Sequence, residues 1–216
     1  MASIRMFLRA FTPRRRSAYL AGLCFLACGI DMNTKTGLGV SPVISVAYCI
    51  AALLGIPFSV MTFVYYVFLI LVQLLLLRSA FEQIQWLQIL TSFLTSALIG
   101  LFDRVLPTAQ SFPGRAVCLL LAIVLTGIGI ILTVGAEFVP NPADGTARAI
   151  SVRTGRSLGF SKNLLDFVSI LLSLALGLVF RGQSLGVGVG TVVTMLLTGR
   201  VVALLQKPVL TLSGLE

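Results

Sequence analysis

Long stretches of the chain contain no charged residue, and this feature constrains the fold more than any other. Residues 58–77, 84–102 and 116–136 are charge-free, and residues 182–199 form a fourth such run. A helix needs about 20 residues, at ~1.5 Å each, to cross the ~30 Å hydrocarbon core of a bilayer. The pattern therefore predicts an all-α membrane protein, a polytopic helical bundle.

Two further apolar runs complete six predicted spans. Residues 17–30 are shorter and are followed by Asp31, and residues 163–180 are interrupted only by Asp166. Of the 216 residues, 57% are hydrophobic and 11% are charged, whereas a soluble domain carries about 25% charged residues. This composition excludes an ordinary water-soluble fold.

The basic residues orient the chain in its bilayer. The net charge is +9, and the Lys and Arg residues lie mostly between the apolar runs, so we expect no nucleic-acid partner. Arg5, Arg9 and residues 14–16 precede the first span, and the positive-inside rule places them in the cytoplasm. We therefore predict a basic cytoplasmic segment at residues 1–16 and a cytoplasmic tail at residues 207–216.

An internal repeat is the most informative pattern in the sequence. Residues 18–46 align with residues 124–152 at an offset of 106, so that Gly29 meets Gly135 and Asp31 meets Glu137. After a slip of two residues the match resumes at an offset of 104. The sequence therefore predicts two membrane repeats, at residues 17–107 and 116–206.

Each predicted repeat contains one short segment, residues 39–55 and 145–159. As helices they would cover only ~22 to 25 Å, and the second contains three arginines that would be costly in lipid. We interpret both as re-entrant or interfacial, which gives six spans in two inverted repeats. Eight spans in two parallel repeats is the alternative. Both arrangements place 12 Lys or Arg residues inside and 4 outside, so charge does not separate them.

These short segments are the predicted binding site. A helix broken inside a membrane protein exposes N–H and C=O groups that can coordinate a solute where lipid is excluded. The candidate stretches are residues 36–42, reading TGLGVSP, and residues 140–146, reading PNPADGT. They supply Gly39, Ser41, Asn141 and Asp144 as candidate ligands, and ordinary interhelical loops are the alternative interpretation.

Ionisable residues within apolar sequence are the second group of candidates, because a charge in a membrane is costly and usually faces a cavity or a partner. Asp31, Glu137 and Asp166 are the predicted sites for a substrate cation or a coupling proton. Lys162 precedes Asp166 by one helical turn. It is either a further ligand or the partner of Asp166 in an intrahelical ion pair.

The sequence gives no indication of an enzyme. It contains no histidine, which excludes His-based zinc sites and Ser-His-Asp triads, and it has no GxxxxGK[ST] phosphate-binding loop. We expect no catalytic residue, no metal site and no cofactor.

Four segments resemble the bacterial YczE/YyaS/YitT family of integral membrane proteins. They are residues 38–48, which read LGVSP and then SVAY, together with residues 63–73, 159–166 and 186–191. The resemblance covers most of the chain. It implies a multi-pass protein of the bacterial inner (plasma) membrane, from a family described as permeases without a settled substrate, and it assigns no site residue.

We therefore expect a secondary transporter, or permease, that moves a small solute or an ion by alternating access between two repeats. The expected partners are the lipid bilayer and the solute, with a homo-oligomer or a membrane partner left open. The alternatives are a membrane scaffold or regulatory subunit, which would not transport, and a substrate-binding membrane subunit of a larger transporter.

Overall fold

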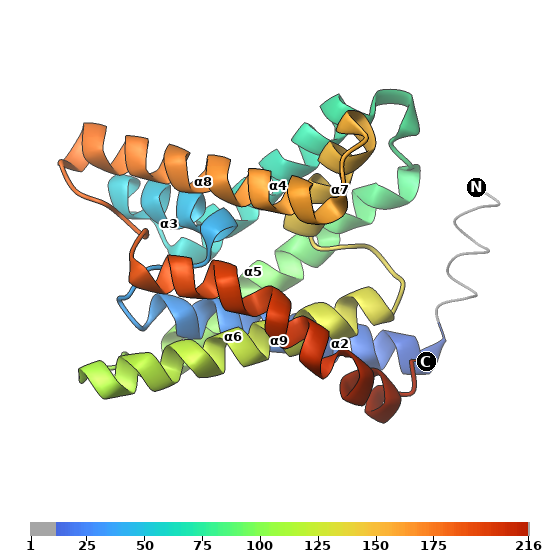
Figure 1. Cartoon of the computed structure of the whole chain (residues 1–216), viewed down its shortest axis with the longest axis horizontal. Helices are drawn as coiled ribbons and strands as arrows, with labels where there is room; N and C mark the ends of the chain where they lie inside the picture. The colour runs from blue at the N-terminus through green and yellow to red at the C-terminus, as the bar shows by residue number, and fades with distance from the viewer. Residues whose placement is uncertain (1–11, 216) are drawn as a thin grey trace.

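A computed structural model describes residues 12–215, and in this range the chain folds into α-helices without any strand (Figure 1). The helices are α2 (Pro13–Thr34), α3 (Pro42–Leu54), α4 (Phe58–Leu77), α5 (Leu87–Val105), α6 (Phe112–Gly135), α7 (Pro142–Thr154), α8 (Leu158–Arg181) and α9 (Val189–Ser213). Two 3-10 turns, η1 (Arg78–Ala80) and η2 (Gln83–Trp86), connect α4 to α5. The predicted all-α, polytopic membrane fold is confirmed.

Five helical segments in the described range are long and apolar enough to cross a membrane, namely Phe58–Ala80, Gln83–Val105, Phe112–Gly135, Leu158–Arg181 and Val189–Ser213. Their outward side chains are apolar, as for Leu75 at 74% exposure and Leu204 at 77%, and such surfaces suit lipid contact. The sixth predicted span corresponds to α2, which is 22 residues long but is not among these five. It packs between α5 and α6, so it needs less lipid-compatible surface and accommodates Asp31 and Asn33 in its interior-facing part.

The two ends of the molecule are fixed by polar contacts. At the end that we call the terminal end, Arg14 Nε donates to the Ser213 carbonyl at 2.9 Å, and Arg15 pairs with Glu137 at 2.7 Å. At the opposite, distal end, Lys35 Nζ lies 2.6 Å from Asp103 Oδ1. Helices α2 and α5 therefore run from the terminal end to the distal end, and α6 and α9 run back (Figure 1).

The short segments predicted from the sequence form α3 and α7, each 13 residues long. They lie in opposite halves of the molecule (Figure 1). Both end at a glycine in the left-handed conformation, Gly55 and Gly155, each with φ of 68°. The chain then enters α4 from the distal end and α8 from the terminal end. Each short helix therefore ends on the same side of the bundle as the long helix before it, α2 for α3 and α6 for α7. A re-entrant segment is predicted to follow this course.

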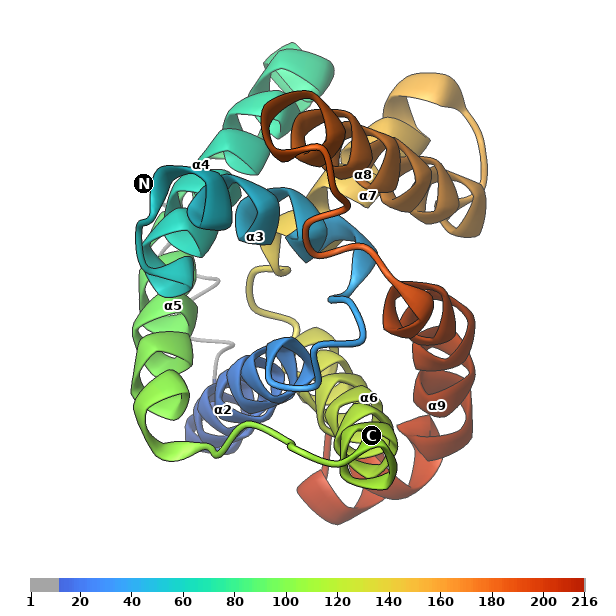
Figure 2. The same cartoon turned by 90° about the vertical axis from the view of Figure 1, so that its left-hand side faces the viewer.

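The two halves of the chain are interleaved rather than side by side. Helix α2 packs along α6, while α3 packs on α8 and α7 packs on α4 (Figure 2). The hydroxyl of Ser173 on α8 donates to the Ser45 carbonyl of α3 at 3.1 Å. In the other pair, the Thr146 hydroxyl of α7 donates to the Leu69 carbonyl of α4 at 3.3 Å.

Small residues allow α2 and α6 to approach closely. A Cβ at Gly29 would lie 2.8 Å from the Ala122 carbonyl oxygen, and a Cβ at Gly129 would lie 2.9 Å from that of Gly22. Such contacts bring two helix backbones together where lipid gives no hydrophobic driving force. Gly29 and Gly129 stand 100 positions apart, and so do Gly22 and Ala122.

The same spacing of 100 relates the ends of the short helices. Pro42 and Pro142 begin α3 and α7, and Gly55 and Gly155 end them. The sequence alignment at offsets of 104 and 106 is therefore wrong, because it matched Gly29, a packing glycine, with Gly135, which closes a helix. At a spacing of 100, Asp31 has no acidic counterpart. The duplication itself stays a prediction.

Two boundaries differ from the sequence prediction at the chain ends. Helix α2 begins at Pro13, so residues 14–16 form its first turn rather than a separate segment. Helix α9 continues through Pro208 to Ser213 and ends at Gly214, which adopts the left-handed conformation. Arg14 Nε donates to the Ser213 carbonyl at this end. Arg5 and Arg9 lie outside the described residues.

Candidate functional site

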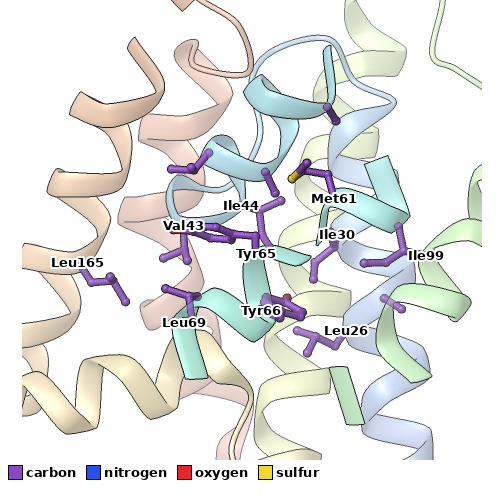
Figure 3. Close-up of a cluster of buried hydrophobic side chains, with 14 of the residues drawn as sticks. Leu26, Ile30, Val43, Ile44, Met61, Tyr65, Tyr66, Leu69, Ile99 and Leu165 are labelled. Atoms are coloured by element: carbon purple, nitrogen blue, oxygen red, sulfur yellow. The ribbon is translucent and has the colours of Figure 1, made fainter. Parts of the chain in front are cut away.

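A cavity of about 310 Å³ lies where the starts of α3 and α7 meet α2, α6, α8 and α9. Its size is at the lower end of the usual range for small-molecule sites, ~300 to 1,000 Å³. One wall is apolar and comes from the buried core, which contains Leu26, Ile30, Val43, Ile44 and Tyr66 (Figure 3). The polar lining consists of Ser41, Tyr66, Thr126, Asn141, Asp144, Lys162, Asn163, Asp166, Thr194 and Thr198.

The first residues of both short helices face this cavity. Each helix begins with a proline, Pro42 or Pro142, whose fixed φ suits the first helical position. Asn141 caps α7, because its Oδ1 accepts a hydrogen bond from the Ala143 N–H at 3.0 Å. Ser41 precedes α3 in the same way but makes no capping hydrogen bond with its side chain. The backbone N–H groups at the start of α3 therefore have fewer hydrogen-bond partners than those at the start of α7.

Helix α7 is held in place by a buried amide pair. Gln73 Nε2 donates to the Pro142 carbonyl at 3.1 Å, and the Gln73 and Gln88 amides bond to each other in both directions at 3.1 Å. Gly145 packs on this pair, since a Cβ there would lie 2.6 Å from Gln73 Oε1. The Tyr66 hydroxyl lies 3.4 Å from Asn141 Nδ2 and joins α4 to the same site.

Three charged side chains line the cavity. Lys162 Nζ on α8 lies 3.5 Å from Asp144 Oδ1 in the first turn of α7. The ion pair of Lys162 is therefore with Asp144, in place of the intrahelical pair with Asp166 that the sequence also allowed. Asp166 is 6% exposed, lines the cavity, and has neither a hydrogen bond nor an ion pair among the described residues.

Asp31 lies apart from this group. It is fully buried, and both carboxylate oxygens lack a hydrogen-bond partner within the described range. It stands one turn before Lys35, whose ammonium binds Asp103 on α5. The hydroxyls of Ser92 and Ser96 on α5 are also buried without a partner in the described structure. Asp31 is thus an interior carboxylate of the α2–α5 region, and it does not line the cavity.

Glu137 and Gly39 also lie outside the cavity. The Glu137 side chain is 68% exposed and pairs with Arg15 at the terminal end. Gly39 lies in the distal loop, with φ of 107°, a conformation that favours glycine. Of the eight predicted site residues, the cavity brings together Ser41, Asn141, Asp144, Lys162 and Asp166, and it leaves out Asp31, Glu137 and Gly39.

Gly39 belongs to a contact that closes the distal end. The Val40 N–H donates to the Gly186 carbonyl at 2.8 Å, and the Gly190 N–H donates to the Leu38 carbonyl at 2.7 Å. A Cβ at Gly39 would lie 2.6 Å from the Gly188 nitrogen. The loop before α3 and the loop before α9 are therefore joined backbone to backbone, beside a second cavity of about 230 Å³.

Sequence reasoning missed Tyr66, Thr194 and Thr198, which also line the cavity. Tyr66 lies within a continuous apolar run, where nothing marks it as different from its neighbours. Thr194 and Thr198 are four residues apart in the last span, and this spacing of polar residues on one helix face was the available signal.

Comparison with known proteins gives the same assignment as the resemblance in the sequence. Two proteins of Bacillus subtilis (strain 168) are each 26% identical to the chain. They are the uncharacterized protein YyaS, over 84% of this chain and 87% of its own length, and the uncharacterized membrane protein YczE, over 86% and 82%. No solved structure matches. The family of unknown function DUF6198 matches residues 13–207, and the chain belongs to this family.

Proposed function

We propose that this membrane protein is a secondary transporter, or permease, whose solute site is the cavity between the starts of α3 and α7. One observation carries the proposal. Two short helices from opposite ends of the bundle direct their N-termini into one largely apolar cavity that also contains polar side chains. Helix starts of this kind supply unpaired N–H donors at the membrane midplane, where transporters bind their solutes.

The arrangement of the two ends supports alternating access. The distal end is closed by the backbone contacts between the two loops. Gly159 and Gly199 line the cavity, and nothing lies within 4 Å of a Cβ built on either of them. Helices α8 and α9 pack on each other far less than the corresponding α4 and α5. In this proposal the solute enters the cavity from the terminal end, and transport requires the distal loops to separate.

The terminal end is the cytoplasmic end in this proposal. Residues 14–16, Arg153 and Arg156 lie there, and so does the C-terminus. The excess of arginine at one end favours the cytoplasmic side of a bacterial inner membrane. The function requires no cofactor or catalytic group, only a solute and the bilayer.

Coupling to a proton or a cation is assigned to Asp166 and Asp31. Asp166 lines the solute cavity, and Asp31 is a buried carboxylate without a hydrogen-bond partner in the described structure. A carboxylate in this position is stabilised by a proton or a cation. Glu137 was predicted for the same role, and its exposed ion pair with Arg15 gives less support.

Reconstitution into proteoliposomes tests the proposal. Solutes that raise the unfolding temperature of the purified protein are offered as labelled substrates to vesicles with and without a pH gradient. We expect uptake by the wild type that Asp166→Asn reduces. Wild-type uptake and pH dependence in both Asp166→Asn and Asp31→Asn would contradict the coupling assignment, and Glu137→Gln should behave like the wild type. No uptake of any solute, with a membrane partner that co-purifies stably, would favour a subunit of a larger complex instead.

A further inference from the structure

We infer that the solute of this cavity is a small zwitterion of the amino-acid class, with an ammonium group for Asp166 and a carboxylate for the start of α3. The inference rests on the proposed transport function and specifies its substrate. Two kinds of polar group in the cavity, one acceptor and one set of donors, have no partner among the described residues.

The unmatched acceptor is Asp166. Its side chain is more than nine-tenths buried, lines the cavity, and has no hydrogen bond or ion pair in the part of the chain described here. Lys162, one turn earlier on α8, attracts Asp166 but is in contact with Asp144. The two carboxylates and one ammonium of the cavity therefore leave one negative charge uncompensated, which is costly in apolar surroundings. An ammonium group of the solute compensates this charge.

The unmatched donors are at the first turn of α3. This helix is 13 residues long, starts at the cavity, and lacks the side-chain cap that Asn141 gives to α7. Val43 and Ile44, whose N–H groups belong to this first turn, line the cavity. A helix start with free N–H groups and a positive dipole end binds a carboxylate well.

The remaining charges of the cavity are already paired. Lys162 and Asp144 neutralise each other across the gap between α8 and α7, and Asn141 satisfies the start of α7. A solute with a single positive charge would leave the α3 donors without a partner, and a solute with a single negative charge would leave Asp166 without one. A zwitterion satisfies both groups.

The placement of Asp166 relative to α3 agrees with this. Asp166 and Tyr66 occupy equivalent positions, because α8 and α4 begin 100 residues apart at Leu158 and Phe58. Tyr66 reaches Asn141 at the start of α7, so Asp166 is expected to face Ser41 at the start of α3. Helix α3 packs on α8, and Ser41 and Asp166 line the same cavity.

The rest of the lining selects for an apolar body. Leu26, Ile30, Ile130 and Met195 line the cavity beside these polar groups, and its volume of about 310 Å³ limits the solute to a small molecule. An aliphatic side chain between or beside the two charges fits these surroundings.

Binding to the purified full chain in detergent tests the inference. The protein amino acids, γ-aminobutyrate and glycine betaine are screened by thermal shift and then by calorimetry. The best-bound zwitterion is compared with its own decarboxylated amine and its own deaminated acid, for example leucine with 3-methylbutylamine and 4-methylpentanoate. We expect the zwitterion to bind at least tenfold more tightly than either fragment, since each fragment loses one charge-assisted contact.

Two variants locate the two contacts. Asp166→Asn should weaken zwitterion binding about tenfold or more and leave the weak binding of the acid unchanged. Ser41→Asp supplies α3 with a carboxylate of its own, so it should weaken binding of the zwitterion and strengthen that of the amine. Asp103→Asn, at the exposed distal end, is the matched control and should bind like the wild type.

The outcomes separate this inference from the proposed function. Equal binding of the amine, or of the acid, would overturn the zwitterion class while leaving a transported solute in place. Failure of every zwitterion to bind, with uptake of another solute, would do the same. No binding and no uptake of any solute would overturn the transport function and the inference together.

Discussion

The Lys162 ammonium lies 3.5 Å from the Asp144 carboxylate and connects the first turn of α7 to α8 beside the cavity. Both side chains are partly enclosed, with exposures of 42% and 30%. The start of α7 also favours a negative charge at Asp144 through the helix dipole. This contact links a short helix to a long one within the second half of the chain.

The stability losses from removing the two partners of this pair should not be additive. We expect Lys162→Met and Asp144→Asn each to lower the free energy of unfolding by about 1–3 kcal/mol, because a partly buried charge loses its partner. The double variant should lose less than the sum. A double-mutant cycle by thermal unfolding in detergent measures this. The same cycle on the exposed Arg15–Glu137 pair should give a coupling of about 0–1 kcal/mol, and additive effects at Lys162 and Asp144 would contradict the account.

Gly145 should tolerate no side chain. In Gly145→Ala the new Cβ would collide with the Gln73 amide that holds the start of α7, and we expect a loss of about 1–3 kcal/mol in stability. Gly199→Ala is the matched control, since nothing lies within 4 Å of a Cβ there, and alanine favours a helix by about 1 kcal/mol. Opposite shifts in unfolding temperature are expected. A stable Gly145→Ala would show that α7 is not anchored on Gln73.

A disulfide across the distal loops should arrest transport. A Cβ at Gly190 would lie 3.0 Å from the Leu38 Cβ and 2.9 Å from the Leu38 carbonyl oxygen. A disulfide between Leu38→Cys and Gly190→Cys therefore requires the two loops to move slightly apart, and uptake by the reduced double variant is the control. The experiment uses a background in which Cys24, Cys28, Cys49 and Cys118 are replaced. Solute uptake should fall under oxidising conditions and return on reduction. Full uptake by the cross-linked protein would mean that the distal end does not open.

Asp31→Asn should stabilise the fold and alter coupling. The aspartate is buried without a hydrogen-bond partner among the described residues, and removing its charge should raise stability by about 1 kcal/mol or more. If Asp31 carries the coupling proton, uptake by the variant also loses its dependence on a pH gradient. The thermal unfolding curve and the uptake assay test these separately. An unchanged unfolding temperature and an unchanged pH response would remove Asp31 from the account.

The fold class followed directly from the sequence, because charge-free runs of helical length have few other solutions in a membrane. The short helices were also predicted, from the glycines at their ends and the arginines in the second one. The spacing of 100 residues between equivalent positions in the two halves was not predicted. Helical membrane sequences are rich in glycine at both packing contacts and helix ends, and an alignment cannot separate Gly29, at a helix crossing, from Gly135, at a helix end.

The candidate site was predicted in part for a similar reason. Asn141, Asp144 and Asp166 are polar residues in apolar or glycine-rich surroundings, which made them visible. Tyr66 was not visible, because an aromatic residue in a span reads as packing. Asp31 and Glu137 were grouped with Asp166 because all three are ionisable residues in or beside apolar sequence, and the tertiary contacts of α2 and α6 place Asp31 and Glu137 elsewhere.

The central claim is that α3 and α7 enter from opposite faces of the membrane, and cysteine accessibility in intact cells measures this directly. In the cysteine-free background, Leu54→Cys at the end of α3 and Arg153→Cys at the end of α7 are treated with a membrane-impermeant thiol reagent. Both positions are exposed. The account predicts labelling of Leu54→Cys from outside, as for Gln110→Cys, and labelling of Arg153→Cys only after the membrane is opened. Labelling of Leu54→Cys and Arg153→Cys from the same side would contradict it and establish two parallel repeats of four spans.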